Sequence, residues 1–180
     1  DPDRLRAVAE DFIKHYETRV AEGATVAGKA MFVCSNRNIA YDFYKIVKEL
    51  RPEWTEKKIC DGGVVLSEKD KKELKPMEKI KLVMTRNKDD EKDLFDMLGT
   101  KEDRKEFDRQ FKNPKSNFKI AIVVDMWLTG FDVPELDTIY IDKPIQQHTL
   151  IQTISRVNRV CEGKDKGLIV DYIGIKKNMN

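Results

Sequence analysis

The segment FKIAIVV at residues 118–124 constrains the fold of this chain more than any other feature of its sequence. Such a run of apolar residues is typical of a strand in a parallel sheet that is covered on both faces, because neither side of the strand meets water. Short apolar runs predict further strands at 30–34, 80–84, 137–141 and 167–170. Helical patterns lie between several of these runs, so the sequence predicts an α/β domain with an open, mostly parallel sheet.

Helices are predicted where apolar residues recur at every third or fourth position. Residues 3–20 have this pattern, which predicts an amphipathic helix packed on the domain. A second helix is predicted to begin after a cap at Ser35 or Asn36 and to continue to about Leu50, where Pro52 stops it. The first pattern precedes the first predicted strand, so we expect residues 3–20 to be a connecting helix.

The middle of the chain carries weaker signals. Residues 89–111 are dense in charge, with few apolar positions, and predict one or two exposed helices that end at Asn113-Pro114. A further short strand is predicted within 57–66, where three apolar residues follow two glycines. Little in residues 51–117 is diagnostic of a function.

Composition narrows the class of protein. A length of 180 residues with 40% hydrophobic content suits one folded domain. The net charge is only +2, from 34 basic and 32 acidic residues, so any nucleic-acid partner has to be argued from local residues. Cys34, Cys60 and Cys161 form no CxxC pair, which argues against a zinc site or disulfide framework and favours a reducing, cytoplasmic compartment. No apolar run approaches the roughly 20 residues that span a bilayer, so no membrane partner is expected.

One segment imitates a phosphate-binding loop. Residues 23–30 match most of GxxxxGK[ST], but Ala30 stands where a hydroxyl would bind Mg²⁺. The segment also leads into a predicted strand, whereas a phosphate loop leads into a helix. We therefore interpret residues 23–30 as an ordinary connection.

The most site-like segment follows the strand at 118–124. It continues as Asp125-Met-Trp-Leu-Thr129-Gly130-Phe-Asp132, which places two carboxylates, a hydroxyl and a glycine beyond a strand end. Gly130 permits a close backbone approach, and Asp132 can accept a hydrogen bond from a ribose or an arginine. A strand, a turn and an Asp cap would give the same pattern without any ligand.

Two arginines on a predicted helix at 149–160 form a second candidate. Arg156 and Arg159 are three residues apart, so both guanidinium groups project from one helix face, and Gln152 lies one turn earlier. Two cations that cannot deprotonate suit the charge of a phosphoryl group in transfer. A solvated basic helix face is the alternative interpretation.

Together these two segments resemble motifs V and VI of superfamily 2 helicases. Gln152, Ser155, Arg156 and Arg159 fill the pattern Q-x-x-G-R-x-x-R, with Ser155 in place of the usual Gly. The strings VVDMWLTGFDVP, IYIDKP, HTLIQTISRVNRV and GLIVDYIGI closely resemble the restriction subunits of type I restriction-modification enzymes. The segment 29–44 resembles motif IV of the same subunits more loosely.

The resemblance implies a fold, a domain division and roles for individual residues. The fold would be a RecA-like three-layer α/β/α domain over residues 23–175, with 1–22 as a helix from a preceding motor lobe and 176–180 as the start of a linker. By resemblance, the arginine fingers are Arg156 and Arg159, and the residues that line the nucleotide cleft are Gln152, Gly130 and Asp132. The same resemblance implies that four residues would face the DNA backbone, namely Thr129, Ser35, Asn36 and Arg37.

Some of the residues in and near these motifs have a simpler, structural interpretation. Ser35, Asn36 and Arg37 also fit a helix N-cap and first turn. His148 is more typical of a structural hydrogen-bonder, and Met126 and Trp127 are more typical of core packing than of base stacking.

The sequence holds only half of an ATPase site. It contains no credible phosphate loop, Mg²⁺-binding acidic motif or nuclease motif. The resemblance implies that ATP and Mg²⁺ are the cofactors, with the Mg²⁺ ligands on a missing first lobe, and that this piece alone is inactive. The implied partners are double-stranded DNA, the first lobe and nuclease domain of the same chain, and methyltransferase and specificity subunits, in a bacterium or archaeon.

Two alternatives remain open at this stage. The chain could instead be a lobe of another superfamily 2 DNA or RNA helicase, or a non-catalytic RecA-like module that binds nucleic acid. The sequence before Asp1 would separate them, because a nuclease motif beside a phosphate loop indicates restriction.

Overall fold

A five-stranded, all-parallel sheet organises the fold. The computed structural model of the chain describes residues 1–126, 136–144 and 168–173. The strands lie in the order β2-β3-β1-β4-β5, and every neighbouring pair is parallel. Their bounds are β1 Lys29–Cys34, β2 Ile80–Leu82, β3 Ile120–Val123, β4 Leu136–Asp142 and β5 Leu168–Asp171. These strands confirm the five principal strand predictions and the α/β class.

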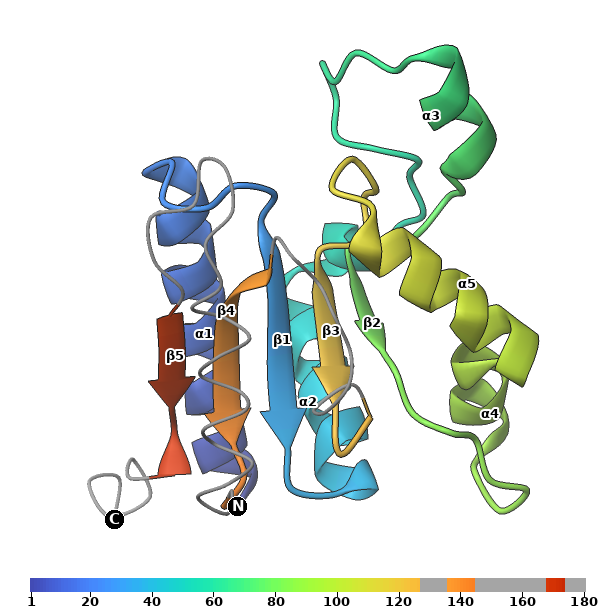
Figure 1. Cartoon of the computed structure of the whole chain (residues 1–180). Coiled ribbons are helices and arrows are strands. Elements are labelled where there is room, and N and C mark those ends of the chain that lie inside the picture. The colour runs from blue at the N-terminus through green and yellow to red at the C-terminus, as the bar shows by residue number, and fades with distance from the viewer. Residues whose placement is uncertain (127–135, 145–167, 174–180) are drawn as a thin grey trace.

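The described helices confirm most of the helix predictions. They are α1 Pro2–Ala21, α2 Arg37–Leu50, α3 Glu68–Glu73, α4 Lys92–Leu98 and α5 Lys101–Lys112, with a 3-10 turn, η1, at Pro52–Thr55. In Figure 1, α1 and α2 lie behind the sheet, while α4 and α5 lie beside β2. The charged region 89–111 thus forms two helices, which end at the Asn113 cap as expected.

Alternating side chains of the central strand divide the core between the two faces of the sheet. From β1, Phe32 belongs to the hydrophobic cluster that α1 and α2 share, whereas Met31 and Val33 belong to a second cluster with Phe111 of α5. All six residues of β1 are buried. A strand covered on both faces has to be apolar at almost every position, which is why the continuous apolar runs predicted the sheet.

Aromatic rings join α1 to the sheet. Phe12 is fully buried, and its ring makes edge contacts with Phe32 at 5.2 Å and Tyr140 at 4.7 Å between ring centroids. All three rings belong to the first cluster. The amphipathic pattern of residues 3–20 is therefore an integral face of the core, and whether α1 connects to a preceding lobe stays a prediction.

The segment that imitates a phosphate loop has a structural role. Gly28 is followed directly by β1, so the loop leads into a strand. The Lys29 side chain is fully buried, and its Nζ donates to the carbonyl oxygens of Phe118 at 2.5 Å and Gln110 at 3.4 Å. The interpretation of residues 23–30 as an ordinary connection is confirmed.

The strand predicted within 57–66 is wrong. Residues 59–66 are loop, and Val65 is 86% exposed. Gly63 adopts a positive φ of 84°, which a regular strand does not allow. Pairing in this region is limited to one antiparallel bridge between Lys58 and Met77, and the short helix α3 between them was not predicted. Three apolar residues beside two glycines gave too little pattern to separate a strand from an exposed loop.

None of the helices in residues 1–126, 136–144 and 168–173 is long and apolar enough to cross a bilayer.

Candidate functional site

The carboxyl ends of the parallel strands gather several polar segments at one edge of the sheet. β2 and β3 lie on one side of β1, and β4 and β5 lie on the other. The direction in which the chain adds strands to the sheet therefore reverses beside β1. Ligands of open α/β sheets bind at such an edge, beside the strands where the order reverses. A cavity of about 340 Å³ opens there, lined by Arg37, Val83, Met84, Thr85, Val124, Asp125 and Met126.

Arg37 is held at the wall of this cavity. Its guanidinium donates to both carboxylate oxygens of Asp90, at 2.8 and 2.7 Å, and to the carbonyl oxygen of Thr85 at 2.5 Å. The Arg37 side chain is 31% exposed, so the cation is fixed in position but still reaches solvent. Such a preorganised guanidinium suits phosphate recognition.

Asp90 shapes the loop that carries Thr85. Burial works against ionisation of Asp90, but the hydrogen bonds from the Asn87 amide and from Arg37 outweigh it and hold the pKa of Asp90 below its ordinary value. The carboxylate therefore stays charged near neutral pH and keeps the Arg37 guanidinium in place.

Ser35 and Asn36 also have structural partners. Asn36 is the N-cap of α2, and its side-chain oxygen accepts from the Ile39 amide at 2.9 Å. Ser35 donates to the carbonyl oxygen of Asp142 on the neighbouring strand at 2.9 Å. The interpretation of these residues as a cap and first turn is confirmed, with Arg37 as the first residue of α2. Their predicted contact with DNA stays a prediction.

Lys143 is a residue of this edge that the sequence interpretation did not single out. It follows β4, and its ammonium group forms an ion pair with Asp125 and donates to the carbonyl oxygen of Val124 at 3.1 Å. The charge of Asp125, which follows β3, is thus compensated by Lys143, which follows β4 on the other side of β1. The sequence signal that could have identified Lys143 was its position just after the predicted strand at 137–141.

A second missed pair anchors α1 to the same edge. The Arg4 guanidinium donates to both carboxylate oxygens of Asp142, at 3.0 and 2.5 Å, and to the carbonyl oxygen of Tyr172 at 3.1 Å. The hydrogen bond to Asp142 raises the pKa of Arg4. Since Asp142 is 5% exposed and already bound to a guanidinium, it is occupied as a structural carboxylate.

The predicted nucleotide residues lie outside the described residues. This holds for Arg156, Arg159, Gln152, Gly130 and Asp132. The same is true of Thr129, which was predicted to face DNA, and of His148 and Trp127, which were interpreted as structural residues. Met126 is described, and it packs partly buried against the second cluster, which confirms its packing role. Within the described part of the chain, no group of three or more His, Cys, Asp or Glu side chains is placed to hold a metal ion.

Comparison with known proteins identifies sequence relatives of one kind. The sequence model of a family described as type I restriction enzyme subunit R domain 3 matches residues 26–174. The chain is 38% identical over 98% of its length to the HindI endonuclease subunit, a type I restriction enzyme, of Haemophilus influenzae. It is 39% identical over 99% of its length to a Methanocaldococcus jannaschii protein assigned as the MjaIXP endonuclease subunit. The chain spans about 15% of the length of each relative.

Solved structures share the fold at low sequence identity. A fragment assigned as an HsdR subunit of a type I restriction enzyme from Vibrio vulnificus aligns over 99% of this chain and 29% of its own, with a TM-score of 0.60 and 13% identity. Domain 2 of the DEAD-box helicase Mss116p aligns over 94% of this chain and 49% of its own, with a TM-score of 0.52 and 16% identity. The RecA-like fold predicted from the motifs is confirmed.

Proposed function

The chain belongs to the family of type I restriction enzyme R subunits, of which it matches domain 3, and from that premise we propose that it is the second RecA-like lobe of an ATP-dependent DNA-translocating motor. The whole enzyme would couple this motor to cleavage of DNA. Because the chain corresponds to only part of its relatives, cleavage would belong to a separate nuclease domain of the same subunit.

The lobe would supply half of the ATPase site. Arg156 and Arg159 would contact the γ-phosphate as arginine fingers, and Gln152, Gly130 and Asp132 would line the same cleft. Bound ATP with Mg²⁺ would supply the phosphoryl group and neutralise part of its charge. By the resemblance, the Mg²⁺ ligands would belong to the first lobe. This chain alone is therefore expected to be inactive.

Opening and closing of the two lobes would then move DNA. Arginine fingers that engage the γ-phosphate favour the closed arrangement, and hydrolysis removes the group that they hold. In this scheme residues 1–22 would lead from the first lobe and, packed on residues 23–175, would move with them, and 176–180 would lead to further domains. Methyltransferase and specificity subunits would choose the DNA sequence.

The proposed DNA contact is supported mainly by the cavity at the carboxyl edge of the sheet, where the Arg37 guanidinium is fixed at the wall. Ser35 and Asn36 are exposed beside it, and Thr129 would add a hydroxyl to the same backbone contact. We propose that these groups contact phosphates, with affinity that depends on salt and little on sequence.

Substitution of Arg37 tests this contact. In the intact subunit, Arg37→Ala is expected to weaken duplex DNA binding and to reduce the slope of log affinity against log salt by about 0.9, the value of one lost phosphate contact. Binding would be measured at several salt concentrations. Arg6→Ala is the matched control, since Arg6 is an exposed arginine of α1 that pairs with Glu10 and Glu49.

The Asp90→Asn variant distinguishes a direct contact of Arg37 with DNA from a purely structural role of the Arg37–Asp90 ion pair. This variant breaks the same pair but keeps the cation, so DNA affinity is expected to stay or rise. Equal weakening by Arg37→Ala and Asp90→Asn would contradict the DNA contact and would show that the pair matters only for the loop.

A further inference from the structure

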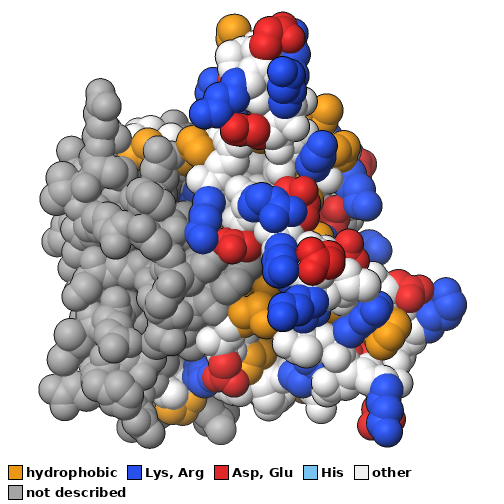
Figure 2. Space-filling model, turned by 45° about the vertical axis from the view of Figure 1, so that its right-hand side comes forward, with side chains coloured by type: hydrophobic (Ala, Val, Ile, Leu, Met, Phe, Trp, Pro, Cys, Tyr) orange, Lys and Arg blue, Asp and Glu red, His pale blue; other side chains and the backbone are white. Residues whose placement is uncertain are grey.

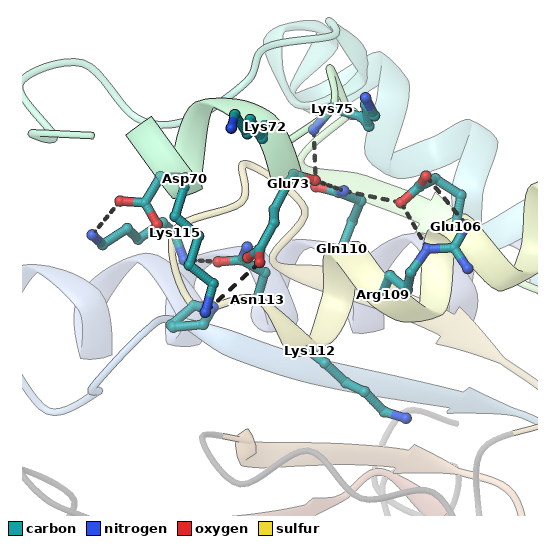
Figure 3. A pocket seen from close by; sticks show the side chains of 12 residues that line it. Asp70, Lys72, Glu73, Lys75, Glu106, Arg109, Gln110, Lys112, Asn113 and Lys115 are labelled. Carbon is teal, nitrogen blue, oxygen red and sulfur yellow. Dashed lines mark hydrogen bonds and ion pairs between the residues drawn. The ribbon is translucent and has the colours of Figure 1, made fainter. Parts of the chain in front are cut away.

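A second groove lies at the opposite edge of the sheet, where the strands begin. It has a volume of about 740 Å³ and separates α3 from α5 (Figure 3). Chain connectivity fixes its position, because α3 leads towards the start of β2 and α5 leads towards the start of β3. The Arg37 cavity lies instead where β2 and β3 end, and the two sites share no lining residue.

The walls of the groove are held together by specific contacts. Backbone hydrogen bonds between Lys58 and Met77, at 3.0 and 2.9 Å, close residues 58–77 into an arm that carries α3. The buried side chain of Gln110 on α5 donates to the carbonyl oxygen of Glu73 at 2.9 Å and accepts from the Lys75 amide at 3.2 Å. One glutamine amide thus joins both walls, and the groove exists before any ligand binds.

Basic side chains outnumber acidic ones along the groove. Six cations line it, namely Lys69, Lys72, Lys75, Arg109, Lys112 and Lys115. Three carboxylates face them, and each has an ion-pair partner within the groove: Asp70 with Lys115, Glu73 with Lys69 and Glu106 with Arg109. Figure 2 shows basic side chains, interspersed with acidic ones, on the face of α3 and α5.

Two lysines carry the surplus charge. Lys72 and Lys75 are exposed, and neither forms an ion pair with any residue that the structure describes. Lys112, the remaining cation, pairs with Asp108, which lies outside the lining. The groove therefore has an excess of two positive charges, those of Lys72 and Lys75, in a chain whose total charge is +2. A net cationic groove with preformed walls attracts a polyanion.

The chemistry of the lining favours phosphates over a protein partner. Apart from Pro114, every lining residue is charged or carries an amide, and no aromatic or large aliphatic side chain is among them. Protein interfaces concentrate their binding energy in buried aromatic and arginine anchors and are depleted in Lys, Glu and Asp. Flexible lysine side chains instead bind phosphates as point charges without reading sequence.

We propose that the groove between α3 and α5 binds the phosphate backbone of duplex DNA, as a second contact separate from the Arg37 cavity. This inference rests on the proposed function, because it takes duplex DNA as the motor's track. A contact at the opposite edge of the sheet would enlarge the footprint of the lobe on DNA.

The test compares two charge-matched double variants in the intact subunit. Lys72→Gln with Lys75→Gln removes the two lysines of the groove. Lys14→Gln with Lys48→Gln removes two exposed lysines from α1 and α2, which cover the other face of the sheet. Binding to a duplex of arbitrary sequence is measured across a salt series, with thermal unfolding as a check on folding.

The groove variant is expected to lower the salt slope by about 1.8, or about 0.9 for each lost phosphate contact, and to weaken binding about tenfold at about 0.1 M salt. The control variant is expected to leave the slope unchanged. If Arg37→Ala lowers the slope but the groove variant behaves like its control, this inference fails and the proposed function stands. A groove variant that loses only assembly with partner subunits overturns the inference in favour of a protein partner. Absence of duplex binding by the wild type would overturn both proposals.

Discussion

Arg159→Ala in the intact subunit is expected to lower DNA-stimulated ATP turnover by about 10³-fold or more, with ATP binding largely kept. An arginine finger stabilises charge that develops on the γ-phosphate in the transition state, so its loss slows the chemical step more than it weakens nucleotide binding. Turnover is measured with saturating duplex DNA, and ATP binding is measured in parallel by titration.

Two further variants make the result specific to this residue. Arg156→Ala is expected to have a similar effect, and the double variant is expected to be less severe than the product of the two, since residues that act as a unit are not additive. Arg6→Ala removes an exposed arginine from α1 and should leave turnover unchanged. Unchanged turnover in Arg159→Ala would contradict the finger assignment and would favour a non-catalytic nucleic-acid-binding module.

Phe12→Ala is expected to lower the free energy of unfolding by about 3–5 kcal/mol, the range for removal of a buried aromatic ring. Phe12 is fully buried among the rings of Phe32, Tyr140 and Trp54, which other elements contribute. The truncation would leave a cavity where α1 meets the sheet. Chemical denaturation of the 180-residue chain measures the effect.

Val20→Ala provides the control for the same helix. Val20 is 43% exposed, so this truncation is expected to change the free energy of unfolding by no more than about 0.5 kcal/mol. A loss below about 1 kcal/mol for Phe12→Ala would contradict the integration of α1 into the core, and α1 would then be a peripheral connecting helix.

The sheet could be predicted from the sequence because its physical requirement is local. A strand buried on both faces has to be apolar along its length, and β1 and β3 meet that requirement with runs that stand out from a highly charged chain. The helix α2 was equally clear, since Asn36 caps it and Pro52 follows its end. The arm at 58–77 was not predictable, because one backbone bridge and the Gln110 side chain hold it rather than a periodic pattern.

The site could be predicted only in part, for a different reason. Arg37 was found through motif resemblance, but its pairing with Asp90 joins residues 53 positions apart. The Arg4 and Asp142 pair spans 138 positions. Partners of this kind are chosen by the packing of the whole sheet, and no local pattern encodes them.

The central claim is that this lobe belongs to a motor that moves along duplex DNA, and translocation tests it most directly. The intact subunit with its partner subunits is given duplexes that carry a third strand at increasing distances from the loading site. Displacement of the third strand is expected to require ATP, to be delayed in proportion to distance, and to be abolished by Arg159→Ala. Displacement without ATP, without a dependence on distance, or at the wild-type rate in Arg159→Ala would contradict the central claim.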